Sequence, residues 1–127
     1  MRAQLLKSNE ESDREKKVLT KSIVNLTAQL GLSRQELSVI LGISEATLSR
    51  IFTKESSYID PHSKEGQLAI LFLRLYRTLA AHFGGNVQHC ELWLRSNNKH
   101  LEGIPIQLIQ SVEGIVIVVQ YLDAMRG

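Results

Sequence analysis

The feature that most constrains the fold is the segment from Leu32 to Phe52, which reads LSRQELSVILGISEATLSRIF. Ser33 followed three residues later by Glu36 is the pattern of a capping box at the start of a helix. Three residues then recur at helical spacing and give that helix one apolar face: Leu37, Ile40 and Leu41. Gly42 follows, and a residue without a Cβ atom tolerates the left-handed backbone of a tight turn. The segment therefore predicts a helix that ends in a sharp turn.

A second helix is predicted directly after this turn, with Ser44 as its N-cap. Its inner face is apolar, and its outer face is small and polar with a single Arg50, which suits a helix in the major groove of DNA. The small Ser38 lets the two helices cross closely. We expect DNA contacts from Arg34, Gln35, Ser44, Glu45, Ala46, Thr47, Ser49 and Arg50. The alternative is a packing hairpin whose outer face is only solvated.

The distribution of charge also favours a nucleic-acid partner for this part of the chain. The whole sequence has a formal net charge of only +2. Residues 14–54, however, hold seven basic and three acidic side chains, a net charge of +4. A basic surface draws a protein to phosphate and makes binding depend on salt. A solvated helix surface would show the same bias.

The chain divides into three predicted parts. Residues 1–12 are polar and are expected to form a flexible arm. Residues 13–59 form the predicted DNA-binding domain, whose first helix is capped by Asp13 and ends near Leu30. Its inner stripe is expected to contain Val18, Ile23, Leu26 and Leu30. Residues 60–127 form a second helical domain, whose first helix is expected to start at Asp60-Pro61 because Asp is a good N-cap and Pro suits the first turn.

The helix expected from Pro61 to Phe83 is apolar on nearly all sides. Such a helix must be buried on nearly all sides, and one helix-turn-helix cannot cover that surface. We therefore predict a homodimer in which part of this helix contacts a second copy, through Leu68, Leu71, Phe72, Leu75 and Tyr76. The alternative is a core helix enclosed within a single chain.

The remaining sequence predicts three further helices, so the fold class is all-α. Gly84-Gly85 ends the long helix, Asn86 caps the next, and Pro105 starts another that runs to Gly114. The last segment, IVIVVQYLDAMRG, has the β-branched residues of a strand. No partner strand is visible, and a lone strand cannot pair its backbone groups, so we predict a helix here.

No catalytic or metal-binding pattern is present. Cys90 is the only cysteine, which fits a reducing cytoplasm. No zinc-ligand spacing links it to the nearby histidines, which are His82, His89 and His100. The first residues contain no apolar run of signal-peptide length. We expect a cytoplasmic protein that is not an enzyme and that needs no metal or cofactor.

Two resemblances add to this interpretation. The segment around Ser38 and Gly42 resembles the Xre-type helix-turn-helix. The C-terminal half resembles the end of the Xre/MbcA/ParS antitoxin family, in which a Trp-Leu pair, an Asn, a Gly, a Pro and two further Gly residues occur in fixed order. Here the matching positions are Trp93, Leu94, Asn97 or Asn98, Gly103, Pro105, Gly114, Leu122 and Gly127.

The resemblance implies an antitoxin of a type II toxin–antitoxin pair, whose partner is a RES-domain toxin that degrades NAD. It implies that the C-terminal segment covers the active-site entrance of the toxin, through Tyr121, Leu122, Asp123, Met125, Arg126 and Gly127. It also implies that the N-terminal half represses its own operon. A homodimer is expected to prefer a palindromic operator. The alternatives are a tail that only covers the core, and a dimeric transcriptional regulator without a toxin partner.

Overall fold

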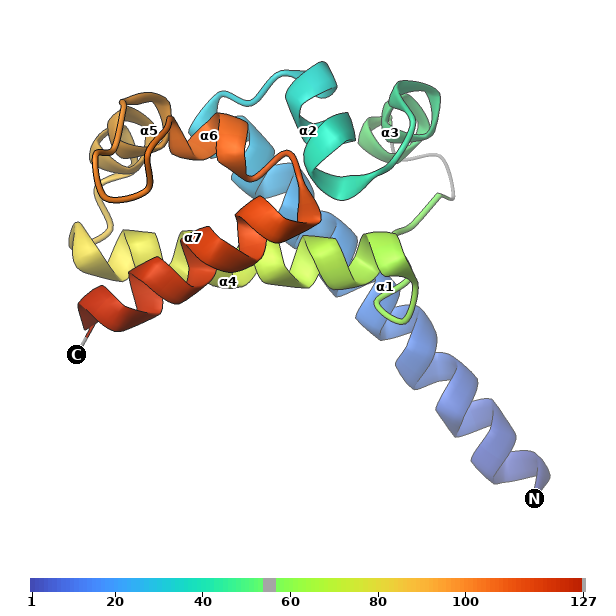
Figure 1. Ribbon diagram of the computed structural model, residues 1–127. Coiled ribbons are helices and arrows are strands. Elements are labelled where there is room, and N and C mark those ends of the chain that lie inside the picture. The colour runs from blue at the N-terminus through green and yellow to red at the C-terminus, as the bar shows by residue number, and fades with distance from the viewer. Residues whose placement is uncertain (54–56, 127) are drawn as a thin grey trace.

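The computed structural model describes residues 1–53 and 57–126 of the 127-residue chain. These residues form seven helices and no β-strand (Figure 1): α1 (Arg2–Leu30), α2 (Arg34–Leu41), α3 (Glu45–Phe52), α4 (Lys64–His82), α5 (Val87–Arg95), α6 (Pro105–Leu108) and α7 (Val112–Arg126). The predicted all-α fold is confirmed, and the last segment is a helix despite its β-branched residues. Within the described ranges, no helix combines the length and hydrophobicity needed to cross a membrane.

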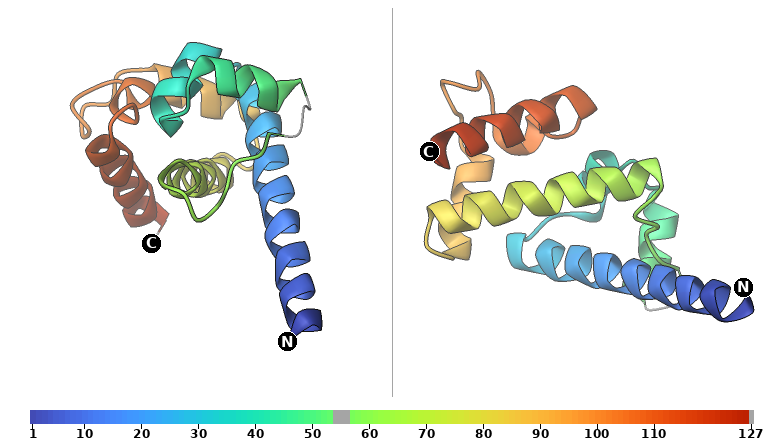
Figure 2. Two further views of the ribbon diagram at one scale, coloured as in Figure 1. Left: turned by 90° about the vertical axis from the view of Figure 1, so that its right-hand side faces the viewer. Right: turned by 90° about the horizontal axis from the view of Figure 1, so that it is seen from below.

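Helix α4 lies at the centre of the molecule, and α1, α2, α5 and α7 all pack against it (Figure 2). Its fully buried side chains are Ala69, Phe72, Leu75 and Leu79. They belong to one hydrophobic core that extends from α1 to α7. The assignment of Phe72 and Leu75 to a contact between copies is therefore wrong, because both side chains are covered within a single chain. Leu68, Leu71 and Tyr76 are half-buried against the same core.

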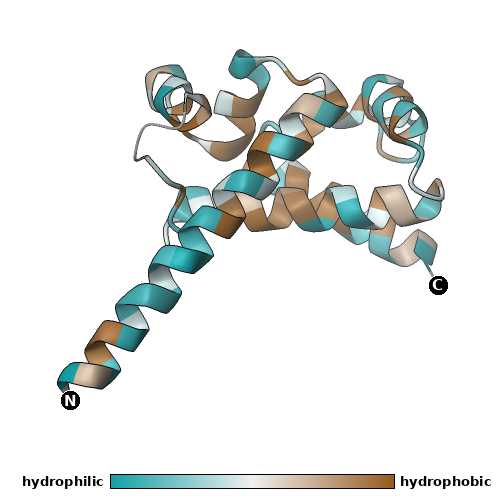
Figure 3. Cartoon of the chain, turned by 180° about the vertical axis from the view of Figure 1, so that it is seen from behind, coloured by the Kyte–Doolittle hydropathy of each residue, from teal (hydrophilic) through white to brown (hydrophobic). Residues whose placement is uncertain are grey.

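Helix α1 starts at Arg2, so the predicted cap at Asp13 is wrong. The expected arm at residues 1–12 is helical, and it projects from the body as the first part of α1 (Figure 3). The cause is visible in the sequence, since no Gly or Pro occurs before Gly31 to interrupt the helix. Gly31 ends it with φ at 62°. The buried stripe contains Leu19, Ile23, Leu26 and Leu30.

Val18 lies outside that stripe and is 60% exposed, contrary to the prediction. Successive residues on a helix point about 100° apart, so placing Leu19 in the core turns Val18 to its edge. The stripe is thus shifted by one residue at its N-terminal end.

Helix α4 starts three residues later than predicted, because Ser63 and not Asp60 is its N-cap. Ser63 accepts a hydrogen bond from the Gly66 amide at 3.0 Å. Asp60 instead closes the preceding turn, where its carboxylate accepts from the amide of His62 at 3.0 Å. This turn lies directly on the helix at Gly66, where a Cβ atom would stand 1.9 Å from the Asp60 carbonyl oxygen.

The break between the last two helices also differs from the prediction. The chain leaves helix at residues 109–111, whereas the sequence suggested a break at Gly114. Ser111 accepts from the Gly114 amide at 3.0 Å. Gly114 lies inside the first turn of α7, where a Cβ atom would stand 1.7 Å from the Leu108 carbonyl oxygen. The missing side chain therefore allows α7 to start against the end of α6.

We predict that Gly114→Ala destabilises the fold although alanine usually favours a helix over glycine. The added methyl group collides with backbone, and overpacking of this kind costs about 1–3 kcal/mol. Urea denaturation followed by circular dichroism measures the loss. The control is Gln120→Ala at an exposed position of the same helix, which should change the stability by no more than about 0.5 kcal/mol. Equal effects of the two substitutions would contradict the close approach.

Candidate nucleic-acid and protein-binding surfaces

Helices α2 and α3 form the helix-turn-helix that the sequence predicts. The capping box is present, since the Glu36 amide donates to Ser33 Oγ and the Ser33 amide donates to Glu36 Oε1, both at 3.0 Å. Gly42 follows with φ at 69°. Ser38 does more than fill a small space, because its hydroxyl donates to the Ile43 carbonyl oxygen at 2.6 Å. This bond fixes the turn between the two helices.

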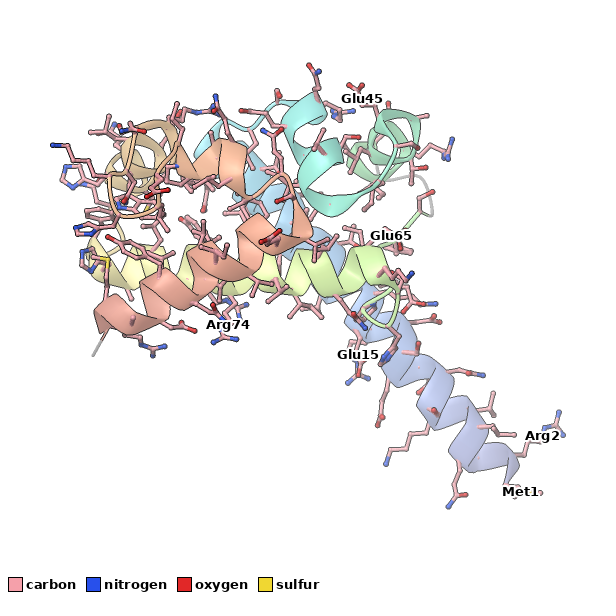
Figure 4. All side chains as sticks on the ribbon, in the orientation of Figure 1. Met1, Arg2, Glu15, Glu45, Glu65 and Arg74 are labelled. Atoms are coloured by element: carbon pink, nitrogen blue, oxygen red, sulfur yellow. The ribbon has the colours of Figure 1, made fainter. Side chains whose placement is uncertain are left out.

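The outer face of α3 is exposed and polar, as predicted. Ser44 accepts from the Thr47 amide at 3.2 Å and so caps the helix. The Arg50 guanidinium donates to Thr47 Oγ1 at 3.1 Å. The remaining predicted contact residues on this helix are also exposed, and they are Glu45, Ala46 and Ser49. Figure 4 shows Glu45 on the outer side of the two helices.

Basic side chains flank this face at the C-terminal end of α3. The Arg34 guanidinium lies 4.6 Å above the centre of the Phe52 ring, which holds it beside α3 as a cation–π pair. Gln35 is exposed next to it. Lys17 and Lys21 of α1 line a hollow that also includes Phe52. These lysines belong to the basic stretch of residues 14–54, but nothing in the sequence indicates that they lie beside the second helix.

Glu36 makes a second contact that no local pattern predicts. Its carboxylate accepts two hydrogen bonds from the guanidinium of Arg95 in α5, at 2.9 and 3.0 Å. Arg95 also donates to the Gly31 carbonyl oxygen at 3.3 Å, and its Nε lies 3.8 Å from Glu91. One carboxylate thus caps α2 and binds a helix 59 residues away. We call this pair the Glu36–Arg95 bridge.

The bridge shifts the titration of both groups. The pKa of the Glu36 carboxyl falls from 4.5 to about 2, chiefly because Arg95 hydrogen-bonds to its charged form, and the Ser33 amide acts in the same direction. Partial burial opposes this shift. The Arg95 pKa is raised, with the hydrogen bond to Glu36 as the main cause. The pair is therefore ionised across the physiological range.

The predicted contact residues on α7 divide between its two sides. Leu122 is only 3% exposed and packs in the core with Ile115, Val118 and Val119, so its assignment to the toxin contact is wrong. Tyr121 stacks against Trp93, with ring centres 6.4 Å apart. Asp123 forms an ion pair with Arg74 of α4. These three residues therefore hold α7 on the body.

The exposed residues of α7 form a largely apolar outer face, which we define as Val116, Ile117, Gln120 and Ala124. Ile117 is 47% exposed. Val112 and Met125 extend the apolar surface at its two ends, and Arg126 is exposed beside Met125. Gly127 lies outside the described residues. This exposed apolar face could have been predicted from the sequence. Residues 115–119 are five consecutive apolar residues, which is more than one buried stripe of a helix can cover.

Both halves of the chain match known protein families. Residues 4–74 match the antitoxin Xre-like helix-turn-helix domain, and this match covers more than half of the sequence. The chain belongs to this antitoxin family. Residues 78–127 of the antitoxin match the Xre/MbcA/ParS C-terminal toxin-binding domain. No curated protein matches the chain.

The two matches assign a type of partner to each half of the antitoxin. The helix-turn-helix domain implies binding to DNA, and the C-terminal domain implies a toxin partner. Antitoxins and helix-turn-helix proteins are typically not enzymes. The Glu36–Arg95 bridge joins the two matched regions, since Glu36 caps the first helix of the helix-turn-helix and Arg95 belongs to the toxin-binding domain.

We predict that the bridge contributes stability above pH 4.5 and that this contribution is lost as the pH falls toward 2. The sign follows from the lowered pKa of Glu36, because the unfolded state binds the proton more readily than the folded state. Arg95→Ala should lower the free energy of unfolding at pH 7 by about 1–2 kcal/mol, the range of a partly screened, charge-assisted hydrogen bond.

Urea denaturation between pH 7 and pH 3 measures both effects. In Glu36→Gln the stability should fall less steeply with acid than in the unsubstituted chain. Glu102→Gln is the matched control, because this exposed carboxylate has no ion-pair partner within the described residues. A Glu36→Gln curve parallel to that of the unsubstituted chain would contradict the role of the bridge.

Proposed function

We propose that this antitoxin neutralises a RES-type, NAD-degrading toxin by covering its active-site entrance with the outer face of α7, and that it represses its own operon as a homodimer bound to a palindromic site. One observation carries the proposal: a polar helix suited to the major groove and an apolar helix face are exposed at separate places on the same body. In Figure 1, α3 lies at the upper right and the end of α7 at the lower left.

The exposed apolar side chains of α7 support a protein partner. Contiguous apolar surface on a water-soluble body marks sites of association. Residues that become fully desolvated in the complex carry most of the binding energy, and Val116 and Ile117 present branched side chains for this purpose. The RES identity of the toxin and the loss of NAD rest on the family resemblance of the C-terminal half.

The geometry of α3 supports the DNA side of the proposal. A helix whose outer face has only small and polar side chains can approach base edges closely. Arg50 is the one long basic side chain on that face. In this structure its guanidinium donates a hydrogen bond to the Thr47 hydroxyl. Arg34, Lys17 and Lys21 lie beside the end of the helix, where a phosphate backbone would run. Arg50 is therefore the candidate for base contact, and the other three are candidates for phosphate contact.

We predict that Ile117→Lys weakens toxin binding by about 30-fold or more. A charge at the centre of the interface should cost at least about 2 kcal/mol of binding free energy. The binding partner to test is the protein encoded by the neighbouring gene, co-purified with the antitoxin. Titration of the two proteins gives the dissociation constant, and the NAD content of cells that express both reports neutralisation.

The matched control is Val39→Lys, at an exposed apolar position of α2. A point variant is preferred to deletion of residues 121–127, since that deletion also removes the buried Leu122 and so unfolds part of the core. Full neutralisation by Ile117→Lys would refute the role of the α7 outer face. A neighbouring toxin that leaves NAD intact would refute the RES assignment alone.

We predict that Arg50→Ala weakens binding to the operator by about 1–3 kcal/mol and relaxes base preference at one position of each half-site. Lys21→Ala should instead weaken binding to all sequences alike. It should also lower the slope of log affinity against log salt concentration by about one, the value of one phosphate contact. Fluorescence anisotropy on operator and scrambled DNA at two salt concentrations separates these effects. An unchanged operator affinity in Arg50→Ala would remove Arg50 from the base-reading residues.

A further inference from the structure

A groove of about 940 Å³ runs along the underside of the body between α1, α4 and the end of α7. Its apolar floor includes Val18 and Ile70, which are 60% and 47% exposed. Four arginines line it, two from α4 and one each from α1 and α7: Arg14, Arg74, Arg77 and Arg126. Figure 4 shows Arg74 of α4 and Glu15 of α1 on this side of the molecule. Two carboxylates of α1, Glu11 and Glu15, also line the groove, so its basic rim is the side formed by α4 and the end of α7.

Most of the arginines on this rim form no ion pair among the described residues. Arg74 pairs with Asp123. Over residues 1–53 and 57–126, no carboxylate lies within 4.0 Å of the guanidinium groups of Arg14, Arg77 or Arg126. Guanidinium groups bind carboxylates in pairs of parallel hydrogen bonds. The groove is therefore suited to an amphipathic segment that carries carboxylates beside an apolar side chain.

The projecting part of α1 has this composition. Leu6, Glu10 and Asp13 are spaced i, i+4 and i+7, so they share one face of the helix. All three are exposed, and Leu6 is 58% exposed. That face offers an apolar side chain for the floor of the groove and two carboxylates for its rim.

The projecting helix also lacks the support that helices of its length need. Residues 2–18 extend about 25 Å at 1.5 Å per residue, and none of their side chains is buried in the chain. In proteins most of the stability of a helix comes from packing of one of its faces. A surface that covers this part of α1 would therefore stabilise it.

We propose that the groove binds the projecting part of α1 from a second copy of this chain. On α1 the groove is lined from Glu11 onward, so it includes the second half of the projecting part. A two-fold axis near Glu11 places each α1 in the groove of the other copy, which gives a closed, self-complementary contact. Leu6 then packs on the floor, and Glu10 and Asp13 meet Arg77 and Arg126. This rests on the homodimer proposed above and names the surface that forms it.

The experiment uses two full-length variants with opposite charge reversals. Variant one carries Glu10→Arg and Asp13→Arg, and variant two carries Arg77→Glu and Arg126→Glu. Each alone places like charges together in both halves of the dimer, so its dimer dissociation constant should rise at least about tenfold. A one-to-one mixture places opposite charges together in both halves and should form a heterodimer as tight as the unsubstituted dimer. Sedimentation equilibrium at micromolar concentration measures all three.

The control variant carries Glu102→Arg and Glu113→Arg, which changes the charge as much as variant one but outside the groove. It should dimerise like the unsubstituted chain, and circular dichroism checks that each variant stays helical. A dimer that persists in both charge-reversed variants, or a mixture that fails to associate, overturns the groove as the contact while the homodimer stands. An unsubstituted chain that is monomeric overturns both proposals.

Discussion

The two regions of this antitoxin are joined by one carboxylate. Glu36 completes the cap of α2 through Ser33 and at the same time accepts two hydrogen bonds from Arg95. The pKa of about 2 shows that the folded state strongly favours its charged form. Because the same carboxylate makes both contacts, the start of the helix-turn-helix cannot move away from α5 without breaking either the cap of α2 or the two hydrogen bonds from Arg95. The orientation of the DNA-facing helices is thus tied to the toxin-binding domain.

Packing in the hydrophobic core also joins the two regions. Helix α4 contains the boundary between the two family matches, and its buried side chains contact helices on both sides of that boundary. Two glycines allow the close contacts at its start and at the start of α7. Gly66 lies against the Asp60 backbone, and Gly114 lies against that of Leu108. The two matched regions therefore share one hydrophobic interior, and the exposed faces of α3 and α7 are held by the same set of side chains.

The features that the sequence predicts correctly depend on residues within one helical turn of each other, although the local caps predicted at Asp13 and Asp60 are wrong. The capping box of Ser33, the turn at Gly42 and the cap at Ser44 were found because their partners are three or four positions away. Arg95 was not found as the partner of Glu36, since nothing local links residues 59 positions apart. Leu122 was misassigned for a related reason. A helix apolar on both sides does not reveal which side faces the body until α4 is in place.

In helix α1, substitutions have a different effect from insertions or deletions that change its length. It runs without a break from Arg2 to Leu30, so each residue is held at a fixed rotation and height relative to the core. Replacing an exposed residue in its first four turns alters one side chain. Inserting or removing one residue there turns everything before it by about 100° and moves it by about 1.5 Å. A substitution in the first part of the chain therefore changes one contact, whereas an insertion or deletion there changes the orientation of every residue before it.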